Sequence, residues 1–174
     1  MIFITGGARS GKSTFAEQLA AGRGGGVTYI ATAAPGDAEM RVRIADHRAR
    51  RPREWKTVEA GTDLPGAVQE ALESEGTVLV DCLTVYLSNL MLNQGLPGDR
   101  LKLAVDQDTD RLVEACRAGN GRVIMVSNEV GMGIVPGNAM ARAFRDLAGH
   151  ANQKLAAAAD EVYLCVSGIP LKVK

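Results

Sequence analysis

Eight residues near the start of the sequence have the types and spacing of a phosphate-binding loop. They are Gly6, Gly7, Ala8, Arg9, Ser10, Gly11, Lys12 and Ser13, and they match the pattern G-x-x-x-x-G-K-[ST]. Glycines at these positions let backbone N–H groups turn inward around an anion, next to the positive end of a following helix. Lys12 supplies a cation for the β- and γ-phosphates, and Ser13 supplies a hydroxyl for Mg²⁺. The motif predicts a site for a nucleoside triphosphate but does not specify the reaction.

An acidic residue closes one of the apolar runs. Asp81 ends the segment 77–81, which reads as a buried parallel strand. In a protein with a phosphate-binding loop, this is where an acid holds Mg²⁺, directly or through water. The other interpretation is a cap for a helix that starts at Leu83. We expect Asp81 and Ser13 to be the metal ligands.

A histidine lies among arginines in the predicted helix 37–50. His47 follows Ile44 on the apolar stripe of that helix. The arginines around it are Arg41, Arg43, Arg48, Arg50, Arg51 and Arg53. Their forks could neutralise phosphates, although a solvated helix face or a nucleic-acid patch would have the same composition. Because nearby cations disfavour imidazolium, we expect a neutral His47 that could attack an α-phosphate and form a nucleotidyl-histidine. His150 lacks such neighbours and is predicted to be a surface or packing residue.

A polar segment with glycines follows the predicted strand 122–127. Asn128 and Glu129 could reach a substrate or a metal-bound water, and Gly131 and Gly133 permit unusual backbone angles. An ordinary surface turn would use the same residues. The sequence leaves both interpretations open.

Composition limits the class of protein. The 174 residues are 46% hydrophobic and 23% charged, which predicts a single globular domain over 1–174. Twenty basic residues balance twenty acidic ones, so neither nucleic acid nor an anionic membrane is an expected partner. No apolar run is long enough to cross a bilayer, and Gly6 interrupts any signal-peptide pattern. The cysteines are few and widely spaced, which favours reduced thiols and a cytoplasmic location.

The elements that position these residues alternate along the chain. Predicted strands cover 1–5, 27–31, 55–59, 77–81, 122–127 and 162–166. Predicted helices start at Ser13 and then cover 37–50, 64–73, 83–92, 101–117 and 138–159, the last being the longest, and 168–174 closes a hairpin. This order predicts an α/β protein with a mainly parallel sheet, whose ligands bind beyond the carboxyl ends of the strands. The apolar helix 83–92 is compatible with an oligomer interface.

These residue patterns fit several classes of protein. One is an enzyme that both phosphorylates and transfers a nucleotide. Others are a small-molecule kinase without nucleotidyl transfer, a nucleic-acid ATPase and a GTP-binding regulator. A nucleic-acid ATPase conflicts with the neutral net charge and the scarcity of aromatic residues. A GTP-binding regulator would leave the histidine and its arginines without a role.

The motifs together resemble one family, the bifunctional adenosylcobinamide kinase / adenosylcobinamide-phosphate guanylyltransferases of cobalamin synthesis. Its most specific features here are R-I-x-x-H-x-x-x-R-P-x-x-W-x-T-x-E over 43–59 and NEVGMGIVP over 128–136, and the likeness covers nearly the whole chain. Members phosphorylate adenosylcobinamide with ATP or GTP, then transfer GMP from GTP to that phosphate and release pyrophosphate. The resemblance implies a RecA-like P-loop fold, Mg²⁺, a corrinoid substrate and a homotrimer. It leaves the corrinoid site unassigned, and we expect an open groove for so large a ligand.

The resemblance also implies roles for individual residues. His47 corresponds to the histidine that becomes guanylylated. Besides the phosphate-binding loop, the implied nucleotide contacts are Ala31, Thr32, Ala33, Arg48, Ala49, Arg50, Arg51, Glu59 and Asp81. Some relatives have Glu where this chain has Asp81, and some have a second histidine where this chain has Asp46. We therefore expect His47 to be the nucleophile, with Asp46 pointing away from it along the helix.

Overall fold

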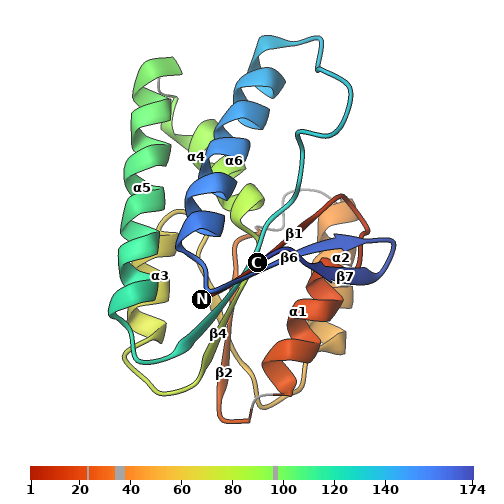
Figure 1. Cartoon of the computed structure of the whole chain (residues 1–174), viewed down its shortest axis with the longest axis vertical. Helices are drawn as coiled ribbons and strands as arrows, with labels where there is room; N and C mark the ends of the chain where they lie inside the picture. The colour runs from red at the N-terminus through yellow and green to blue at the C-terminus, as the bar shows by residue number, and fades with distance from the viewer. Residues whose placement is uncertain (23, 34–37, 96–97) are drawn as a thin grey trace.

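A computed structural model describes residues 1–22, 24–33, 38–95 and 98–174 of the chain (Figure 1). In this part of the chain, seven strands form one sheet in the order β3-β2-β4-β5-β1-β6-β7. The strands are β1 (Ile2–Gly6), β2 (Val27–Ala31), β3 (Lys56–Glu59), β4 (Thr77–Asp81), β5 (Arg122–Val126), β6 (Glu161–Val166) and β7 (Ile169–Lys172). Neighbouring strands are parallel except β6 and β7, which form the predicted closing hairpin. The predicted α/β class with a mainly parallel sheet is confirmed.

The helices fall where the sequence predicts them, with shifted ends. They are α1 (Lys12–Ala21), α2 (Ala38–Arg50), α3 (Leu64–Ala71), α4 (Leu83–Gln94), α5 (Gly98–Ala118) and α6 (Ala139–Ala158). Helix α5 has 21 residues and α6 has 20, so the prediction that α6 is the longest was wrong. The expected start of α5 missed a first turn that contains Asp99, whose charge favours a helix N-terminus. The expected cap at residues 36–37 and part of the expected turn at 95–98 lie outside the described residues.

Helices cover both faces of the sheet. Figure 1 shows α1 and α2 on one side and α3, α4, α5 and α6 on the other. Side chains alternate along β1 accordingly: Phe3 packs into the core below α3 to α6, whereas Ile2 and Ile4 pack with α1. None of the helices in the described ranges is long and apolar enough to cross a membrane.

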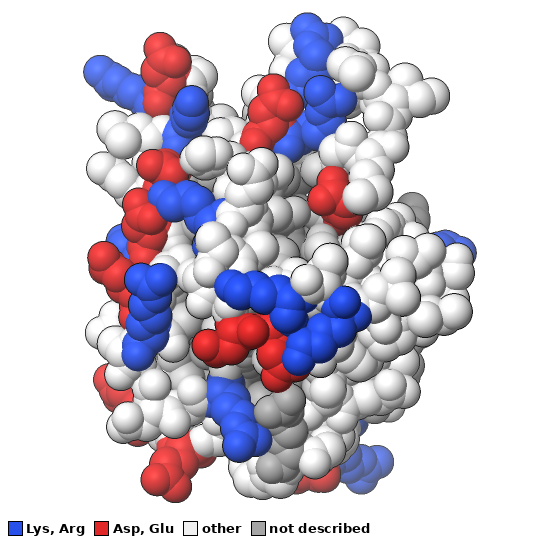
Figure 2. Space-filling view, in the orientation of Figure 1, with Lys and Arg blue, Asp and Glu red and all other residues white. Residues whose placement is uncertain are grey.

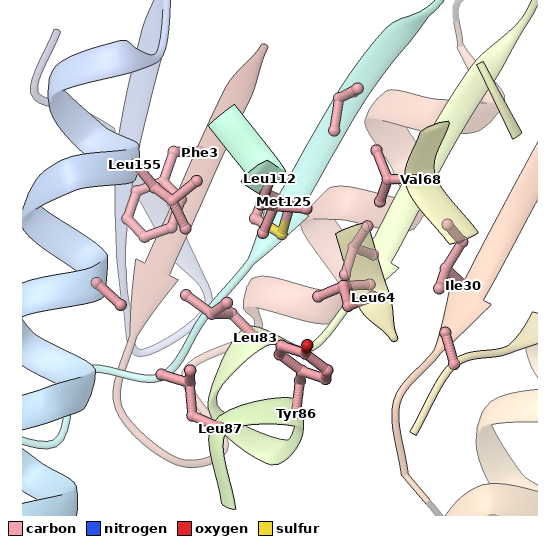
Figure 3. Close-up of a cluster of buried hydrophobic side chains, with 14 of the residues drawn as sticks. Phe3, Ile30, Leu64, Val68, Leu83, Tyr86, Leu87, Leu112, Met125 and Leu155 are labelled. Carbon is pink, nitrogen blue, oxygen red and sulfur yellow. The ribbon is translucent and has the colours of Figure 1, made fainter. Parts of the chain in front are cut away.

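The apolar helix α4 belongs to the core of its own chain. Leu83, Tyr86 and Leu87 are each at most 2% exposed and pack with residues of β1, β5 and α6 (Figure 3). Of the large apolar residues of α4 only Leu92 is prominently exposed, at 67%. The apolar run that suggested an oligomer interface is therefore explained by internal packing.

Hydrogen bonds tie the segments that follow four strands to the same edge of the sheet. The Glu129 N–H donates to the carbonyl of Gly6 at 2.9 Å. The Thr32 hydroxyl donates to the carbonyl of Cys82 at 2.8 Å and accepts from the Cys82 N–H at 2.9 Å. This edge, at the carboxyl ends of β1, β2, β4 and β5, is where a parallel sheet binds its ligands.

Candidate active site

The phosphate-binding loop lies between β1 and α1, which confirms its predicted strand and helix context. Gly11 caps α1 with a left-handed backbone (φ 89°), and no side chain in the described ranges caps the helix, so its first N–H groups remain open. Arg9 also has a positive φ of 56°. Such left-handed residues turn N–H groups inward to form an anion-binding nest. Lys12 is 8% exposed, and its Nζ donates to the carbonyl of Gly7 at 3.1 Å, so the ammonium group folds over the loop.

The hairpin of β6 and β7 packs against the phosphate-binding loop. The N–H of Gly168 donates to the carbonyl of Ser10 at 2.9 Å. A Cβ at Gly11 would lie 3.0 Å from the Cα of Gly168, and a Cβ at Gly6 would lie 2.5 Å from the carbonyl oxygen of Cys165. The Oγ of Ser10 is buried and has no hydrogen-bond partner among the described residues. Close backbone approach explains the need for glycine at both positions.

We expect Gly11→Ala to lower the free energy of unfolding by about 1–3 kcal/mol, because the positive φ and the backbone of Gly168 both oppose a Cβ. Gly7→Ala is the matched control, since a Cβ there meets no heavy atom within 4 Å. Urea unfolding of the two variants measures the difference. Equal midpoints for the two variants would contradict this interpretation of the loop.

His47 on α2 faces two carboxylates from other elements. Its Nδ1 lies 3.8 Å from Oε1 of Glu17 on α1 and 4.0 Å from Oδ2 of Asp81 at the end of β4. Both Nδ1 of His47 and Oε1 of Glu17 are buried, and neither has a hydrogen-bond partner among the described residues. The arginine-rich setting predicted for His47 did not include these two carboxylates. Glu17 was not predicted, although it lies one helical turn after Ser13 and thus on the same face of α1.

A second missed residue, Tyr29 of β2, connects Asp81 to the arginine segment. Its hydroxyl donates to Oδ2 of Asp81 at 3.1 Å. Burial, reinforced by the charge of Asp81, raises the pKa of Tyr29, so the hydroxyl keeps the proton that it donates. The guanidinium carbon of Arg51 lies 3.3 Å from the centroid of the Tyr29 ring. Nε and Nη1 of Arg51 are buried without a partner among the described residues. Because a buried charge is costly unless it is paired, these nitrogens suit the binding of an anion.

The other predicted nucleotide contacts lie in different settings. Arg48 and Glu59 pair with each other at 2.9 Å on the exposed surface. Thr32 is fully buried, and its hydroxyl, its N–H and its carbonyl are bonded to Cys82, Asp81 and Asn89. The polar groups of Thr32 link β2 to β4 and α4, and its contact with a nucleotide stays a prediction. Ala31 and Ala33 are half-buried at the end of β2, and Ala49 is exposed on α2. The side chains of Arg50 and Asp46 lie outside the described residues.

The oxygen ligands present suit Mg²⁺. In the described ranges, no three His, Cys, Asp or Glu side chains come together as a metal centre of their own. Ser13 offers a hydroxyl at the start of α1, and Asp81 offers the carboxylate oxygen that Tyr29 does not occupy. Mg²⁺ typically takes one or two protein oxygens and completes its shell with phosphates and water. The donor set fits a metal that arrives with its nucleotide.

The segment after β5 forms a turn at Glu129 and contacts α4 through Asn128. Oε1 of Glu129 accepts from the N–H of Gly131 at 2.6 Å, which supports the turn interpretation for this acid. Nδ2 of Asn128 donates to Oγ1 of Thr84 on α4 at 2.6 Å.

His150 is a surface residue as predicted, with Nε2 3.6 Å from Asp106. The three cysteines are free.

A strand, a phosphate-binding loop and a helix, with an acid at the end of β4, define a P-loop nucleotide-binding protein. A solved structure of a prototypical ATPase from the type III secretion system of pathogenic bacteria has the same fold, with a TM-score of 0.56 and 14% identity. That alignment covers 94% of this chain and 50% of the ATPase chain, so this chain spans half its length. The likeness concerns the fold alone.

The chain belongs to the cobinamide kinase / cobinamide phosphate guanyltransferase family, whose profile matches residues 2–173. It is 45% identical over 181 residues to the bifunctional adenosylcobalamin biosynthesis protein CobU of Salmonella typhimurium, covering 100% of this chain and 99% of that protein. It is 44% identical to CobU of Escherichia coli, with the same coverage. The bifunctional protein CobP of Pseudomonas aeruginosa is 44% identical over 98% of this chain and 95% of its own length. The family identified from the histidine segment is thereby confirmed.

Proposed function

We propose that this chain phosphorylates adenosylcobinamide with ATP or GTP and then transfers GMP from GTP to adenosylcobinamide phosphate. One observation carries the proposal: the same site holds a P-loop lysine for γ-phosphoryl transfer and a histidine beside Asp81. A kinase without nucleotidyl transfer has no use for His47 at this place. Relatives named as bifunctional at 44–45% identity support the pair of activities.

The phosphoryl step uses the P-loop. The loop N–H groups and Lys12 would hold the β- and γ-phosphates while the substrate hydroxyl attacks the γ-phosphorus and the bond to the bridging oxygen breaks. Ser13 and Asp81 would hold Mg²⁺, which would supply positive charge at the phosphate oxygens. Nε and Nη1 of Arg51 are buried without a partner in the described part of the chain, and they could neutralise charge on another part of the nucleotide.

The guanylyl step uses His47. With its Nδ1 proton directed at Glu17 and Asp81, the ring would attack the α-phosphorus through the lone pair of Nε2. The bond from the α-phosphorus to the bridging oxygen breaks, and pyrophosphate leaves. A phosphate oxygen of the corrinoid then attacks the same phosphorus, the P–N bond breaks, and His47 is restored. The Nδ1 to Glu17 distance closes to a hydrogen bond with a movement of roughly one ångström.

We expect Glu17→Gln to slow guanylylation of His47 by about 10- to 100-fold, because the amide loses the charge that orients the ring. The rate of label uptake from α-labelled GTP, measured in a single turnover without corrinoid, reports this step. Glu73→Gln is the matched control, since Glu73 is exposed beyond the end of α3. An uptake rate equal to that of the control would remove Glu17 from the mechanism.

Product analysis tests the proposed function. The protein with adenosylcobinamide, GTP and Mg²⁺ is expected to form adenosylcobinamide phosphate first, then adenosylcobinamide-GDP and pyrophosphate. If the protein phosphorylated adenosylcobinamide but transferred no GMP, it would be a small-molecule kinase without nucleotidyl transfer. No corrinoid product under conditions where nucleotide binds would contradict both activities.

We also infer that residues 1–174 act as one unit in a cytoplasmic homotrimer that binds small molecules and no nucleic acid. Basic and acidic side chains alternate over the face in Figure 2 and form no basic stripe there. Exposed apolar residues support an assembly: Ile134, Ile169, Leu171 and Val173 are each more than half exposed. Light scattering in solution measures the mass of the assembly, and a monomer would contradict the inference.

A further inference from the structure

A cavity of about 330 Å³ lies beyond the carboxyl ends of β2, β4 and β5, apart from the phosphate-binding loop. Helix α4 supplies Thr84, Ser88 and Asn89 to its wall. Asn128 and Val130 line it from the segment after β5, and Phe144 lines it from α6. None of the residues given to the implied nucleotide site reaches this wall except Ala33 at the end of β2.

The chemistry of this wall is polar and neutral. Hydroxyl and amide side chains are combined with apolar ones, and no charged side chain of the described residues takes part. A phosphate or a carboxylate would lose its hydration there without gaining a cation. A neutral ligand with both polar and apolar groups fits better, because such walls fix orientation through a few polar contacts.

The two asparagines are held so that the cavity offers hydrogen-bond acceptors. Nδ2 of Asn89 donates to the carbonyls of Thr32 and Gly61, at 2.9 and 3.1 Å, and these two acceptors determine which end of the amide is nitrogen. Nδ2 of Asn128 donates to Thr84 at 2.6 Å. Neither Oδ1 has a partner among the described residues, so each remains available to a ligand. Two acceptors favour a ligand that donates hydrogen bonds, and primary amides are neutral groups that do so.

The cavity adjoins the candidate site for phosphate chemistry. Asp81 is the last residue of β4, and Thr84 lies in the first turn of α4, which begins at Leu83. Asn128 is hydrogen-bonded to Thr84. Thr32, which follows β2 and precedes Ala33, is bonded to Cys82 at the same junction. A ligand in the cavity would therefore lie next to a nucleotide on the P-loop.

We propose that this cavity binds a carboxamide arm of the corrinoid substrate and so positions its aminopropanol arm for reaction. This inference rests on the proposed function. The periphery of a corrinoid carries neutral primary amides, which donate N–H groups, next to apolar methyl groups. A volume of about 330 Å³ holds one such arm and not the corrin ring, which would remain in the open groove expected for so large a ligand.

Ser88→Leu tests the proposal by filling the cavity. The KM for adenosylcobinamide phosphate is expected to rise about tenfold or more, relative to the KM for GTP in the same variant. Ser74→Leu is the matched control, because Ser74 is exposed outside the cavity, and both of its KM values are expected to equal those of the wild type. Val130→Phe narrows the cavity from a loop and gives a second variant if Ser88→Leu does not fold.

A corrinoid whose carboxamide arms are hydrolysed to carboxylates tests the chemistry of the ligand. With the wild-type protein, its KM is expected to be about tenfold higher or more, because a charged arm meets no cation in the cavity. Unchanged corrinoid KM values in the folded variants, or an equal KM for the hydrolysed corrinoid, would overturn the proposal while the proposed function stands. A wild-type protein that takes up no label from GTP and forms no corrinoid product would instead contradict the proposed function itself.

Discussion

Replacing His47 with alanine is expected to lower the transfer of GMP to adenosylcobinamide phosphate by about 10⁴-fold or more, the scale on which loss of a covalent nucleophile acts. The reason is that His150, the other histidine, lies on α6 beside Asp106 and cannot replace the imidazole beside Asp81. Phosphorylation of adenosylcobinamide is expected to fall far less, because the hydroxyl of the substrate attacks the γ-phosphorus directly. Parallel initial rates for the two reactions measure the difference.

His150→Ala is the matched control for this variant, since His150 is exposed on α6. It is expected to retain both activities. If His47→Ala transferred GMP at the wild-type rate, the covalent route would be wrong and direct attack by the corrinoid phosphate on GTP would replace it. Equal losses of both activities would indicate that His47 supports the nucleotide site as a whole.

Replacing Lys12 with alanine is expected to lower phosphoryl transfer by about 10²- to 10³-fold, because one cation that stabilises charge in the transition state is lost. The Lys12 ammonium already lies over the loop through its bond to Gly7, so little reorganisation is needed when phosphates bind. The guanylyl step is expected to fall as well, since the same loop would hold the leaving pyrophosphate.

Initial rates with ATP measure the Lys12 effect, with Lys102→Ala on the exposed face of α5 as the control. Lys12→Ala is expected to unfold near the same urea concentration as the wild type, since the Lys12 side chain makes one hydrogen bond of modest net value with the described residues. Wild-type turnover in Lys12→Ala would remove the P-loop from the kinase reaction.

Local patterns explain why much of the fold could be predicted. The phosphate-binding loop needs only adjacent residues, and Asp81 is found by its place at the end of an apolar strand. Several elements are separated by glycine or proline in the sequence, as at 24–26, Pro52 and 95–98. The ends of elements were less accurate, because the first turn of a helix such as α5 depends on capping and on contacts that the hydrophobic pattern does not record.

The surroundings of His47 could not be predicted in the same way. Glu17, Tyr29 and Asp81 come from α1, β2 and β4, and only the packed fold brings them to α2. The arginine-rich sequence suggested a cationic setting because neighbours along the chain were the only ones visible. Helix α4 (Leu83–Gln94) is a second example. Its hydrophobic sequence was compatible with an oligomer interface, but hydrophobicity does not distinguish such a helix from one buried in the core of its own chain.

The measurement that tests the central claim most directly is the mass of the intact protein after incubation with GTP and Mg²⁺ in the absence of corrinoid. We predict an increase equal to one guanylyl group, stable in base, labile in acid and located on the peptide that contains His47. Addition of adenosylcobinamide phosphate is expected to remove it. A protein that forms adenosylcobinamide-GDP without ever carrying this adduct, or that carries it on another residue, would contradict the account.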